Sequence, residues 1–308
     1  MSARAGASRP LFPPEVRAEV KALACELPAA SGLPLSRFST REIARAAVAR
    51  GIVCEISGAT VWRWLGEDAI KPWQYRSWIF PRDPEFRAKA ARVLDLYEDR
   101  FEGKLLHPAD FVLCADEKPS IQARRRKHET LPARGSRGQK VEHEYERMGA
   151  LCYFATWDVK RARLFGGCEQ RSGIEPFERH VSQVMGEEPY RSARRVFLVV
   201  DNGSSHRGQA AVKRLAAKWP KWPELVLVHL PIHASWLNQV EIYFSIVQRK
   251  VLTPNDFDDL AAVEERLLAF QRHYEEVAQP FEWTFTRRDL DRLLERLGKR
   301  EPALSLAA

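Results

Sequence analysis

Two short apolar runs, each followed by an aspartate, constrain the fold of this chain most strongly. Residues 111–115 precede Asp116, and residues 196–200 precede Asp201. Continuous apolar runs of this length are typical of strands that are buried on both faces of a sheet. Ligands gather at the carboxyl ends of such strands in an open α/β sheet. The two aspartates therefore predict a polar site at one edge of a sheet, although either could instead be a turn residue or a helix cap.

Strand and helix patterns alternate over the C-terminal two thirds of the chain. A third apolar run begins at residue 224, and residues 149–169 have the pattern of an antiparallel hairpin. Helical spacing of apolar residues occurs at 84–103, 174–185, 207–219, 238–251 and 259–277. This order predicts an α/β fold in which helices flank a mixed sheet.

Residues 39–67 have the pattern of two helices joined by a short turn. Ser39 and Glu42 form the sequence of a capping box, and Gly51 ends the first helix. Ser57 is the predicted N-cap of the second helix. The arrangement is typical of a helix-turn-helix, with an ordinary helical hairpin as the alternative.

The second of these helices contains the apolar residues Val61, Trp62 and Leu65. Its exposed positions are then Ser57, Thr60 and Arg63, whose side chains suit contacts with phosphates or base edges. We therefore predict that these three residues bind DNA.

Positive charge is concentrated in one segment. The chain has a net charge of +8, and residues 118–140 contain eight bases and one acid. An excess of this kind suggests a polyanionic partner, although a charge run can also be a solvated face. The densest part predicts backbone contacts with DNA from Arg124, Arg125, Arg126 and Lys127.

Glu241 lies at the margin of an apolar stripe. Residues 240, 243, 244, 247 and 251 follow the spacing of a helix face that packs on a core. A carboxylate in this position is costly unless a partner compensates its charge, and a salt bridge or an extended side chain would be the ordinary solution. Alternatively, Glu241 joins Asp116 and Asp201 in one site.

Three converging carboxylates would raise one another's pKa values unless a cation neutralised them. Ligands that are all oxygen favour Mg²⁺ or Mn²⁺, and two such ions would suit in-line phosphoryl transfer. Zinc is not predicted, because the five cysteines form no C-x-x-C pair and Pro231 interrupts the pair His229 and His233. Candidate neighbours of the site are Asn202, His206 and Asn238; His206 could lie near a scissile phosphate or have a capping role.

Three blocks of sequence resemble one family. "ADEKPSIQAR", "VDNGSSHRGQA" and "LPIHASWLNQVEIYFSIVQRKVLTPNDF" are similar to the DDE transposases of bacterial insertion sequences in the mariner superfamily. The resemblance implies a ribonuclease-H-like catalytic domain with a triad of Asp116, Asp201 and Glu241, two divalent ions, and DNA strand cleavage and transfer. It also implies that the partners are element ends and target DNA, that a homodimer assembles on DNA, and that the protein is associated with a bacterial nucleoid.

The resemblance leads to a division of the chain into four parts. We expect a helix-turn-helix module at 1–70, a linker and connecting helix at 71–104, the catalytic domain at 105–297 and a tail at 298–308. Relatives usually have two helix-turn-helix units, whereas one pattern is found here, so the first unit is expected to be shortened or absent. The chain has no apolar run of about 18 residues and no signal peptide, which predicts a soluble intracellular protein without a membrane partner.

Two other functions fit the same residues. A metal-dependent nuclease of this fold would hydrolyse DNA without joining strands. A domesticated or inactive transposase would act as a DNA-binding regulator.

Overall fold

The computed structural model describes residues 12–74, 81–206 and 208–298. The chain divides into two compact units, Met1–Ile79 and Phe80–Ala308, each with its own hydrophobic core. Trp78, in the predicted linker, and residues 299–308 of the predicted tail lie outside the described residues. Among the described helices, none is both long enough and apolar enough to cross a membrane.

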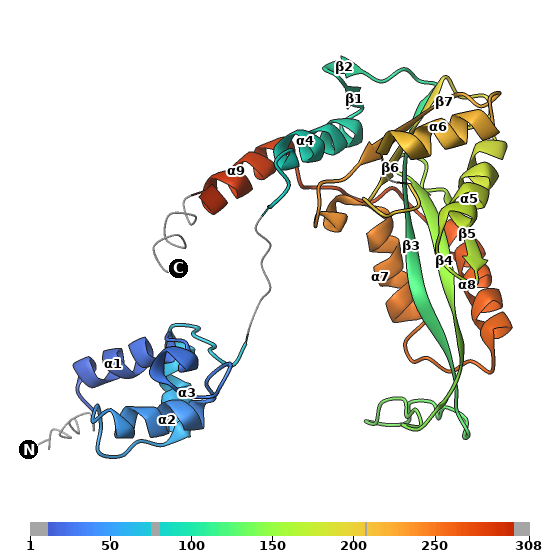
Figure 1. The fold of residues 1–308 in the computed structure, drawn as a ribbon. Coiled ribbons are helices and arrows are strands. Elements are labelled where there is room, and N and C mark those ends of the chain that lie inside the picture. Colours follow the sequence, from blue (N-terminus) through green and yellow to red (C-terminus); the bar gives the residue numbers. More distant parts are fainter. Residues whose placement is uncertain (1–11, 75–80, 207, 299–308) are drawn as a thin grey trace, which may run out of the picture. The chain divides into compact units, whose positions relative to one another are not determined.

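The first unit is a small helical module (Figure 1). It contains α1 (Pro14–Ala24), the 3₁₀ turn η1 (Pro28–Ser31), α2 (Thr40–Ala49) and α3 (Gly58–Glu67). The predicted caps are confirmed: Ser39 and Glu42 form a reciprocal capping box, and the Ser57 hydroxyl accepts a hydrogen bond from the Thr60 amide at 3.1 Å. Gly51 has φ +70° after α2, a conformation that glycine adopts without strain. α2 and α3 are thus the two predicted helices joined by a short turn.

The apolar residues of α3 are divided between core and surface. Trp62, which was grouped with Val61 and Leu65 as an apolar residue, has a side chain that is 61% exposed, whereas Trp64 is 7% exposed and packs in the core. The buried positions are Val61, Trp64 and Leu65, which share one face at helical spacing. Hydrophobicity alone cannot assign two tryptophans in one short helix to core or surface. The assignment depends on which face of the helix packs against the other helices of the unit.

The second unit is built on a five-stranded mixed sheet with the order β5–β4–β3–β6–β7. Its strands are β3 (Asp110–Arg125), β4 (Glu146–Asp158), β5 (Leu164–Glu169), β6 (Arg195–Val200) and β7 (Glu224–His229). β3 pairs antiparallel with β4 and parallel with β6, and β7 pairs parallel with β6. A small hairpin of β1 (Arg100–Phe101) and β2 (Lys104–Leu105) precedes the sheet. The predicted mixed α/β class is confirmed.

β3 is longer than predicted. It was expected to end at Asp116, but it continues to Arg125 as half of a long hairpin with β4. Pro119, which argues against a strand interior, lies at a break in register between Lys118 and Ile121, where Ser120 has φ +58°. The break absorbs the proline, and the strand resumes beyond it.

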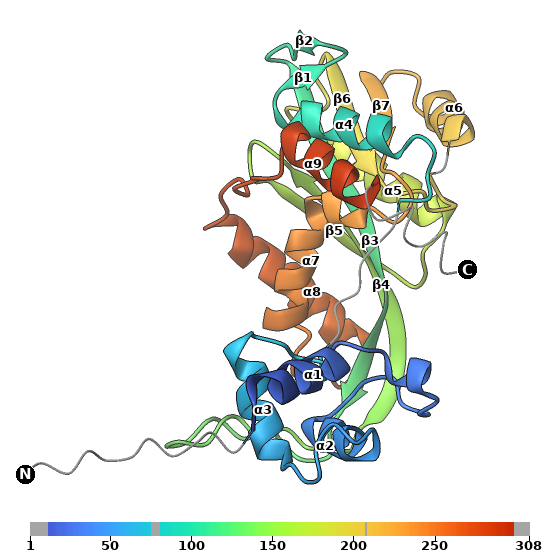
Figure 2. The ribbon, with the colours of Figure 1, turned by 90° about the vertical axis from the view of Figure 1, so that its left-hand side faces the viewer.

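Helices cover both faces of the sheet (Figure 2). α4 (Phe86–Tyr97), α7 (Val240–Lys250), α8 (Leu260–Glu275) and α9 (Arg287–Gly298) contribute buried residues to one face, and α5 (Ile174–Gly186) and α6 (Gly208–Lys218) to the other. The side chains of β3 alternate accordingly. Val112 and Cys114 face the first group of helices, and Phe111 and Leu113 face the second. α4, expected in a connecting segment, packs within this unit, and α9 was not predicted.

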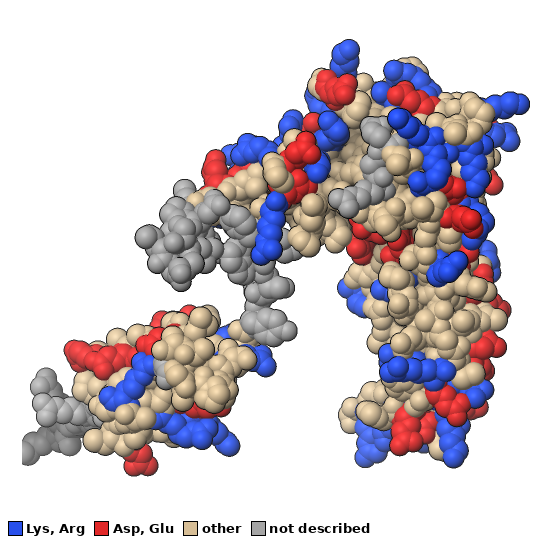
Figure 3. All heavy atoms as spheres, viewed as in Figure 1, with Lys and Arg blue, Asp and Glu red and all other residues tan. Residues whose placement is uncertain are grey.

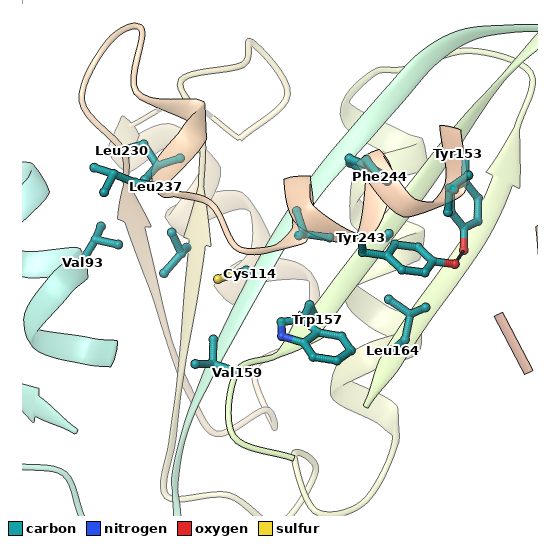
Figure 4. Close-up of a cluster of buried hydrophobic side chains, with 14 of the residues drawn as sticks. Val93, Cys114, Tyr153, Trp157, Val159, Leu164, Leu230, Leu237, Tyr243 and Phe244 are labelled. Atoms are coloured by element: carbon teal, nitrogen blue, oxygen red, sulfur yellow. Dashed lines mark hydrogen bonds between the residues drawn. The ribbon is translucent and has the colours of Figure 1, made fainter. Parts of the chain in front are cut away.

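α7 lies on the sheet through an aromatic contact (Figure 4). Tyr243 and Phe244 face Tyr153 of β4, and the hydroxyls of Tyr153 and Tyr243 are 3.1 Å apart. The predicted apolar stripe of α7 is confirmed, because all five of its residues are buried. This packing fixes the first turn of α7, which carries Glu241, against the centre of the sheet.

The two tryptophans of α3 provide a matched test of the first unit. Trp64→Ala should lower the free energy of unfolding by about 3–5 kcal/mol, because it opens a cavity in the small core. Trp62→Ala should change it by less than about 0.5 kcal/mol, because its ring is mostly solvated. Urea denaturation followed by far-UV circular dichroism would measure both. Equal losses in the two variants would contradict the assigned face of α3.

Candidate active site

Asp116 and Asp201 lie next to each other at one edge of the sheet. The parallel pairing of β3 with β6 runs from Asp110 opposite Arg195 to Cys114 opposite Val199. Continuing this register by two residues brings Asp116 opposite Asp201, just beyond the end of β6. The predicted convergence of the two aspartates is therefore a consequence of strand register.

Both aspartates continue the row of side chains that faces α7. Cys114 on β3 and Val199 on β6 belong to the core beneath α4, α7 and α8. Side chains alternate along a strand, so residues two positions later point to the same face. Asp116 thus points towards the helix that carries Glu241, and Asp201 follows the same row just beyond the end of β6.

A buried asparagine links Asp116 to the start of α7. Asn238 is fully buried, and its Nδ2 donates to the carbonyl of Ala115 at 3.0 Å and to Oδ2 of Asp116 at 3.2 Å. The carbonyl of Asn238 in turn accepts from the amide of Glu241 at 3.0 Å. Asn238, predicted as a neighbour of the site, thereby connects the strand that carries one carboxylate to the helix that carries another.

The electrostatics show that the three carboxylates act on one another. Burial raises the pKa of Asp116 to about 7, with further contributions from Asp201 and Glu241. Burial also raises the pKa of Glu241, with Lys118 opposing the shift and Asp201 adding to it. The charges of Asp201 and Lys118 thus act on Glu241, and its position in the first turn of α7 adds the favourable field of the helix N-terminus.

The pKa of Asp201 shifts in the opposite direction. A hydrogen bond from His206 lowers it most, and the amide of Gly203 adds a second hydrogen bond at 2.7 Å. Asn202 points elsewhere, because its Nδ2 donates to the carbonyl of Leu230 at 2.7 Å. Two carboxylates in one site thus have different environments, one largely desolvated and one held by donors.

Sequence reasoning missed a fourth carboxylate. Glu117 follows Asp116 on β3 and points to the opposite face, where its Oε2 is buried without a hydrogen bond among the described residues. Burial raises its pKa, with an opposing effect of His206 and a further increase from Asp201. Its position after the buried run was the available signal, but the alternation of the strand directs it away from α7.

The basic hairpin segment is less uniformly positive than the sequence suggested. The segment that leads into β4 and the first residue of β4 add Glu142, Glu144 and Glu146, which reduces the net charge of residues 118–146 to +4. Figure 3 shows both signs of charge at the tip of the hairpin. Arg125 pairs with Glu146 at 2.5 Å, and the Arg126 guanidinium donates to backbone carbonyls, including that of Asn255.

The other two predicted DNA-contacting bases, Arg124 and Lys127, form no salt bridge among the described residues. Arg124 lies over the ring of Tyr145 at 4.6 Å, and Lys127 is exposed while its amide donates to Glu142. A cavity of about 740 Å³ opens along the β3–β4 hairpin. Its lining includes Lys118, Ser120, Gln122, Arg124, Tyr145 and Gln248. Lys118, which lines this cavity, also opposes the rise in the pKa of Glu241.

The predicted DNA contacts of α3 lie at its N-terminal end. Ser57 and Thr60 are engaged in the cap, with their hydroxyl oxygens 3.0 Å apart, and Arg63 donates to Oγ1 of Thr60 at 3.3 Å. Arg63 is exposed, as is Trp62 beside it.

The donor set at the sheet edge fits a hard cation. Among the residues that the structure describes, no three His, Cys, Asp or Glu side chains lie close enough together to hold a metal ion. The three carboxylates are nevertheless in electrostatic contact, and no hydrogen bond from a described residue ends on Oδ2 of Asp201. Oxygen-only donors with excess negative charge suit Mg²⁺ or Mn²⁺ better than a soft metal.

Comparison with known proteins gives the family. Residues 111–264, half of the 308-residue chain, match the family model of the DDE superfamily endonucleases. The chain belongs to this family. The match includes the positions of Asp116, Asp201 and Glu241, and it confirms that the chain is a DDE enzyme, as the three sequence blocks predicted. No curated protein sequence matches this DDE endonuclease significantly.

Solved structures confirm the ribonuclease-H-like fold of the DDE endonuclease. The Mos1 mariner paired end complex with Mn has a TM-score of 0.54 at 14% identity, covering 97% of this chain and 80% of that chain. The corresponding complex with Mg has the same TM-score and identity and covers 98% and 83%. The Mos1 strand transfer complex has a TM-score of 0.52 at 13% identity, covering 97% and 80%.

Replacement of Asp116 should stabilise the metal-free protein. Its pKa of about 7 lies above the ordinary value of 3.8, so the stability it contributes is complete at low pH and is lost as the pH rises towards 7. Asp116→Asn should therefore raise Tm at pH 8 in the presence of a chelator. The corresponding gain in the free energy of unfolding has an upper bound of roughly 4 kcal/mol.

The pH dependence of Tm distinguishes removal of the Asp116 charge from a stabilisation that is independent of pH. The difference between Asp116→Asn and wild type should grow between about pH 4 and pH 7 and disappear at lower pH, as measured by calorimetry. Asp258→Asn, at an exposed carboxylate, should leave Tm unchanged. A lower Tm of Asp116→Asn at pH 8 would contradict the proposed repulsion.

Proposed function

We propose that this DDE endonuclease is a transposase, which cuts DNA strands at the ends of a mobile element and joins them to target DNA. Asp116, Asp201 and Glu241 are its catalytic carboxylates. The observation that carries the proposal is that two adjacent strands and one helix bring these carboxylates into electrostatic contact at one sheet edge. The family match and the likeness to Mos1 complexes with paired ends and with transferred strands support it.

The same carboxylates would hold the metal. Two divalent ions, Mg²⁺ or Mn²⁺, fit their oxygen-only donors, and the Mos1 complexes include one with Mn and one with Mg. When bound, such ions activate an attacking oxygen and stabilise a leaving oxygen in an in-line displacement at phosphorus.

The chain's own residues position the reacting groups. Asn238 keeps Asp116 and the start of α7 together, so that Glu241 approaches from above the sheet edge. Lys118, which lines the cavity along the hairpin and acts on the charge of Glu241, is placed to attract a DNA phosphate. Arg124 and Lys127 would extend this attraction along the backbone.

The first unit would recognise DNA through α3. Arg63 and Trp62 project from its exposed side, and Arg41 and Arg45 of α2 line an adjacent groove of about 620 Å³. A recognition helix with these side chains suits the major groove of double-stranded DNA. Element ends would be its specific ligand, and a homodimer would be required to hold two ends together.

Loss of one carboxylate should separate catalysis from binding. Purified wild-type protein should nick plasmid DNA and join strands with Mn²⁺, whereas Asp201→Asn should lose at least 100-fold in rate and keep its DNA affinity. The control is Asp258→Asn, at an exposed carboxylate outside the site, which should cut normally. Gel analysis of products measures both steps.

The products also decide between the functions that remain. Cleavage without joined strands would favour a nuclease of the same fold. DNA binding without any cleavage by the wild type would favour a regulator. Equal cleavage by wild type and Asp201→Asn would contradict the assignment of the carboxylates.

Arg63→Ala tests the role of α3. The variant should weaken binding to element-end DNA by roughly 10-fold and reduce the salt dependence by about one ion. Arg50→Ala is the matched control, because it removes a positive charge from the same unit, at a side chain that pairs with Glu26. Fluorescence anisotropy at several salt concentrations measures both. The same affinity loss in the two variants would indicate a general charge effect and not a contact of α3.

A further inference from the structure

His206 is buried beside the carboxylates and does not point towards solvent. Its side chain is 1% exposed, and its Nε2 forms a short hydrogen bond with Oδ1 of Asp201. The sequence left two roles open for this histidine, near a scissile phosphate or as a capping group. Its burial excludes contact with a DNA phosphate in this conformation and directs attention to Asp201.

The imidazole is fixed by groups on several sides. Its Nδ1 lies 3.0 Å from Oγ of the buried Ser205, and its ring packs on that of Phe177 with centroids 4.8 Å apart. The backbone of the loop is held as well, because the carbonyl of Ser205 accepts from Arg214 at 2.7 Å and that of His206 accepts from His229 at 2.8 Å. The ring therefore has little freedom to leave Asp201.

The carboxylate determines which nitrogen donates. An ionised carboxylate only accepts hydrogen bonds, so Nε2 carries the proton that is donated to Asp201, and Nδ1 of a neutral imidazole can accept from the Ser205 hydroxyl. An imidazolium would donate through the same atom. The hydrogen bond to the carboxylate therefore does not depend on the charge of the histidine.

Gly203 makes room for this hydrogen bond. A Cβ atom at this position would lie 2.9 Å from Oδ1 of Asp201 and 2.9 Å from Cε1 of His206, closer than real Cβ atoms approach. The Gly203 amide also donates to the same Oδ1 at 2.7 Å. Glycine is thus required by the close approach of the two side chains.

Both hydrogen bonds to Asp201 end on one oxygen. Oδ1 accepts from Gly203 and His206, whereas Oδ2 accepts no hydrogen bond from the described residues. His206 packs on Phe177, in the core beneath α5, while the row of side chains that includes Asp201 faces α7. The histidine therefore supports the carboxylate from behind.

We propose that His206 is a positioning residue, which, together with Gly203, holds Oδ1 of Asp201 so that Oδ2 is presented to a divalent cation beside Asp116 and Glu241. This inference rests on the proposed function, because it assumes that Asp201 binds the metal. Hydrogen bonds that orient ligating carboxylates typically change metal affinity by 10- to 100-fold.

Two substitutions at His206 separate the hydrogen bond from the packing. His206→Phe keeps the ring and removes the donor, whereas His206→Gln keeps an amide donor near the position of Nε2. At fixed pH, His206→Phe should weaken Mn²⁺ binding by about 10- to 100-fold, and His206→Gln should recover most of it. Gly203→Ala should behave like His206→Phe, because it disrupts the same contact.

Mn²⁺ binding is read without catalysis. Electron paramagnetic resonance of free Mn²⁺ measures affinity, and the rise of Tm with Mn²⁺ concentration gives a second value. Plasmid nicking by His206→Phe should recover at higher Mn²⁺ concentration, since the chemistry of the carboxylates is retained. Wild-type Mn²⁺ affinity in His206→Phe, or equal losses in the Phe and Gln variants, would overturn the proposal.

His180 supplies the matched control. It is also a buried histidine of the second unit, with Nε2 2.8 Å from Oγ1 of Thr156 and its ring near that of Phe154, and it forms no hydrogen bond with any of the three carboxylates among the described residues. His180→Phe should lower Tm and leave Mn²⁺ affinity unchanged. An equal loss of affinity in this variant would show that His206 has only a structural role.

The two proposals fail in different ways. Wild-type protein that binds Mn²⁺ through Asp201 but joins no DNA would contradict the transposase function and leave the role of His206 intact. Active wild-type protein whose Mn²⁺ requirement is unaltered in His206→Phe would contradict the role of His206 alone.

Discussion

The parallel pairing of β3 with β6 is the constraint on which the rest of the second unit depends. Its register brings Asp116 opposite Asp201, and a shift by one residue would turn one aspartate to the opposite face. Helices cover both faces, so such a shift would also expose apolar side chains and bury polar ones. The position of the candidate site is therefore stabilised by the hydrophobic core and not by the carboxylates themselves.

The carboxylates oppose folding where they meet. Asp116 is desolvated and repelled, which raises its pKa to about 7, while donors from His206 and Gly203 lower the pKa of Asp201. The donors His206 and Gly203 compensate the charge of Asp201, whereas the charge of Asp116 needs a cation or a proton to compensate it. Folding brings the carboxylates together at a cost in free energy. Such a site favours cation binding, because a bound cation neutralises the repulsion between the carboxylates.

Local charge density was a poor guide to the DNA-binding surface. The excess around residues 118–140 looked like one basic segment, but the hairpin returns three glutamates to it. Arg125 and Arg126 are used to hold the hairpin together, whereas Lys118, outside the densest part, lies beside both the cavity and Glu241. The pairing of β3 with β4 decides which of these bases are engaged within the hairpin.

The sequence by itself determined the mixed α/β class, the caps of α2 and α3 and the apolar stripe of α7. It also singled out Asp116, Asp201 and Glu241 as candidate site residues. These features depend on local periodicity, on capping residues and on aspartates that follow apolar runs. Only the tertiary structure decided that β3 continues past Pro119, that Trp64 and not Trp62 is buried, and that His206 lies behind Asp201. Each of these depends on contacts between different elements of the fold. β4 pairs with β3 beyond the end of β6, α1 and α2 pack on one face of α3, and Phe177 of α5 packs on the histidine. A local sequence pattern does not indicate which other element of the fold a side chain will contact.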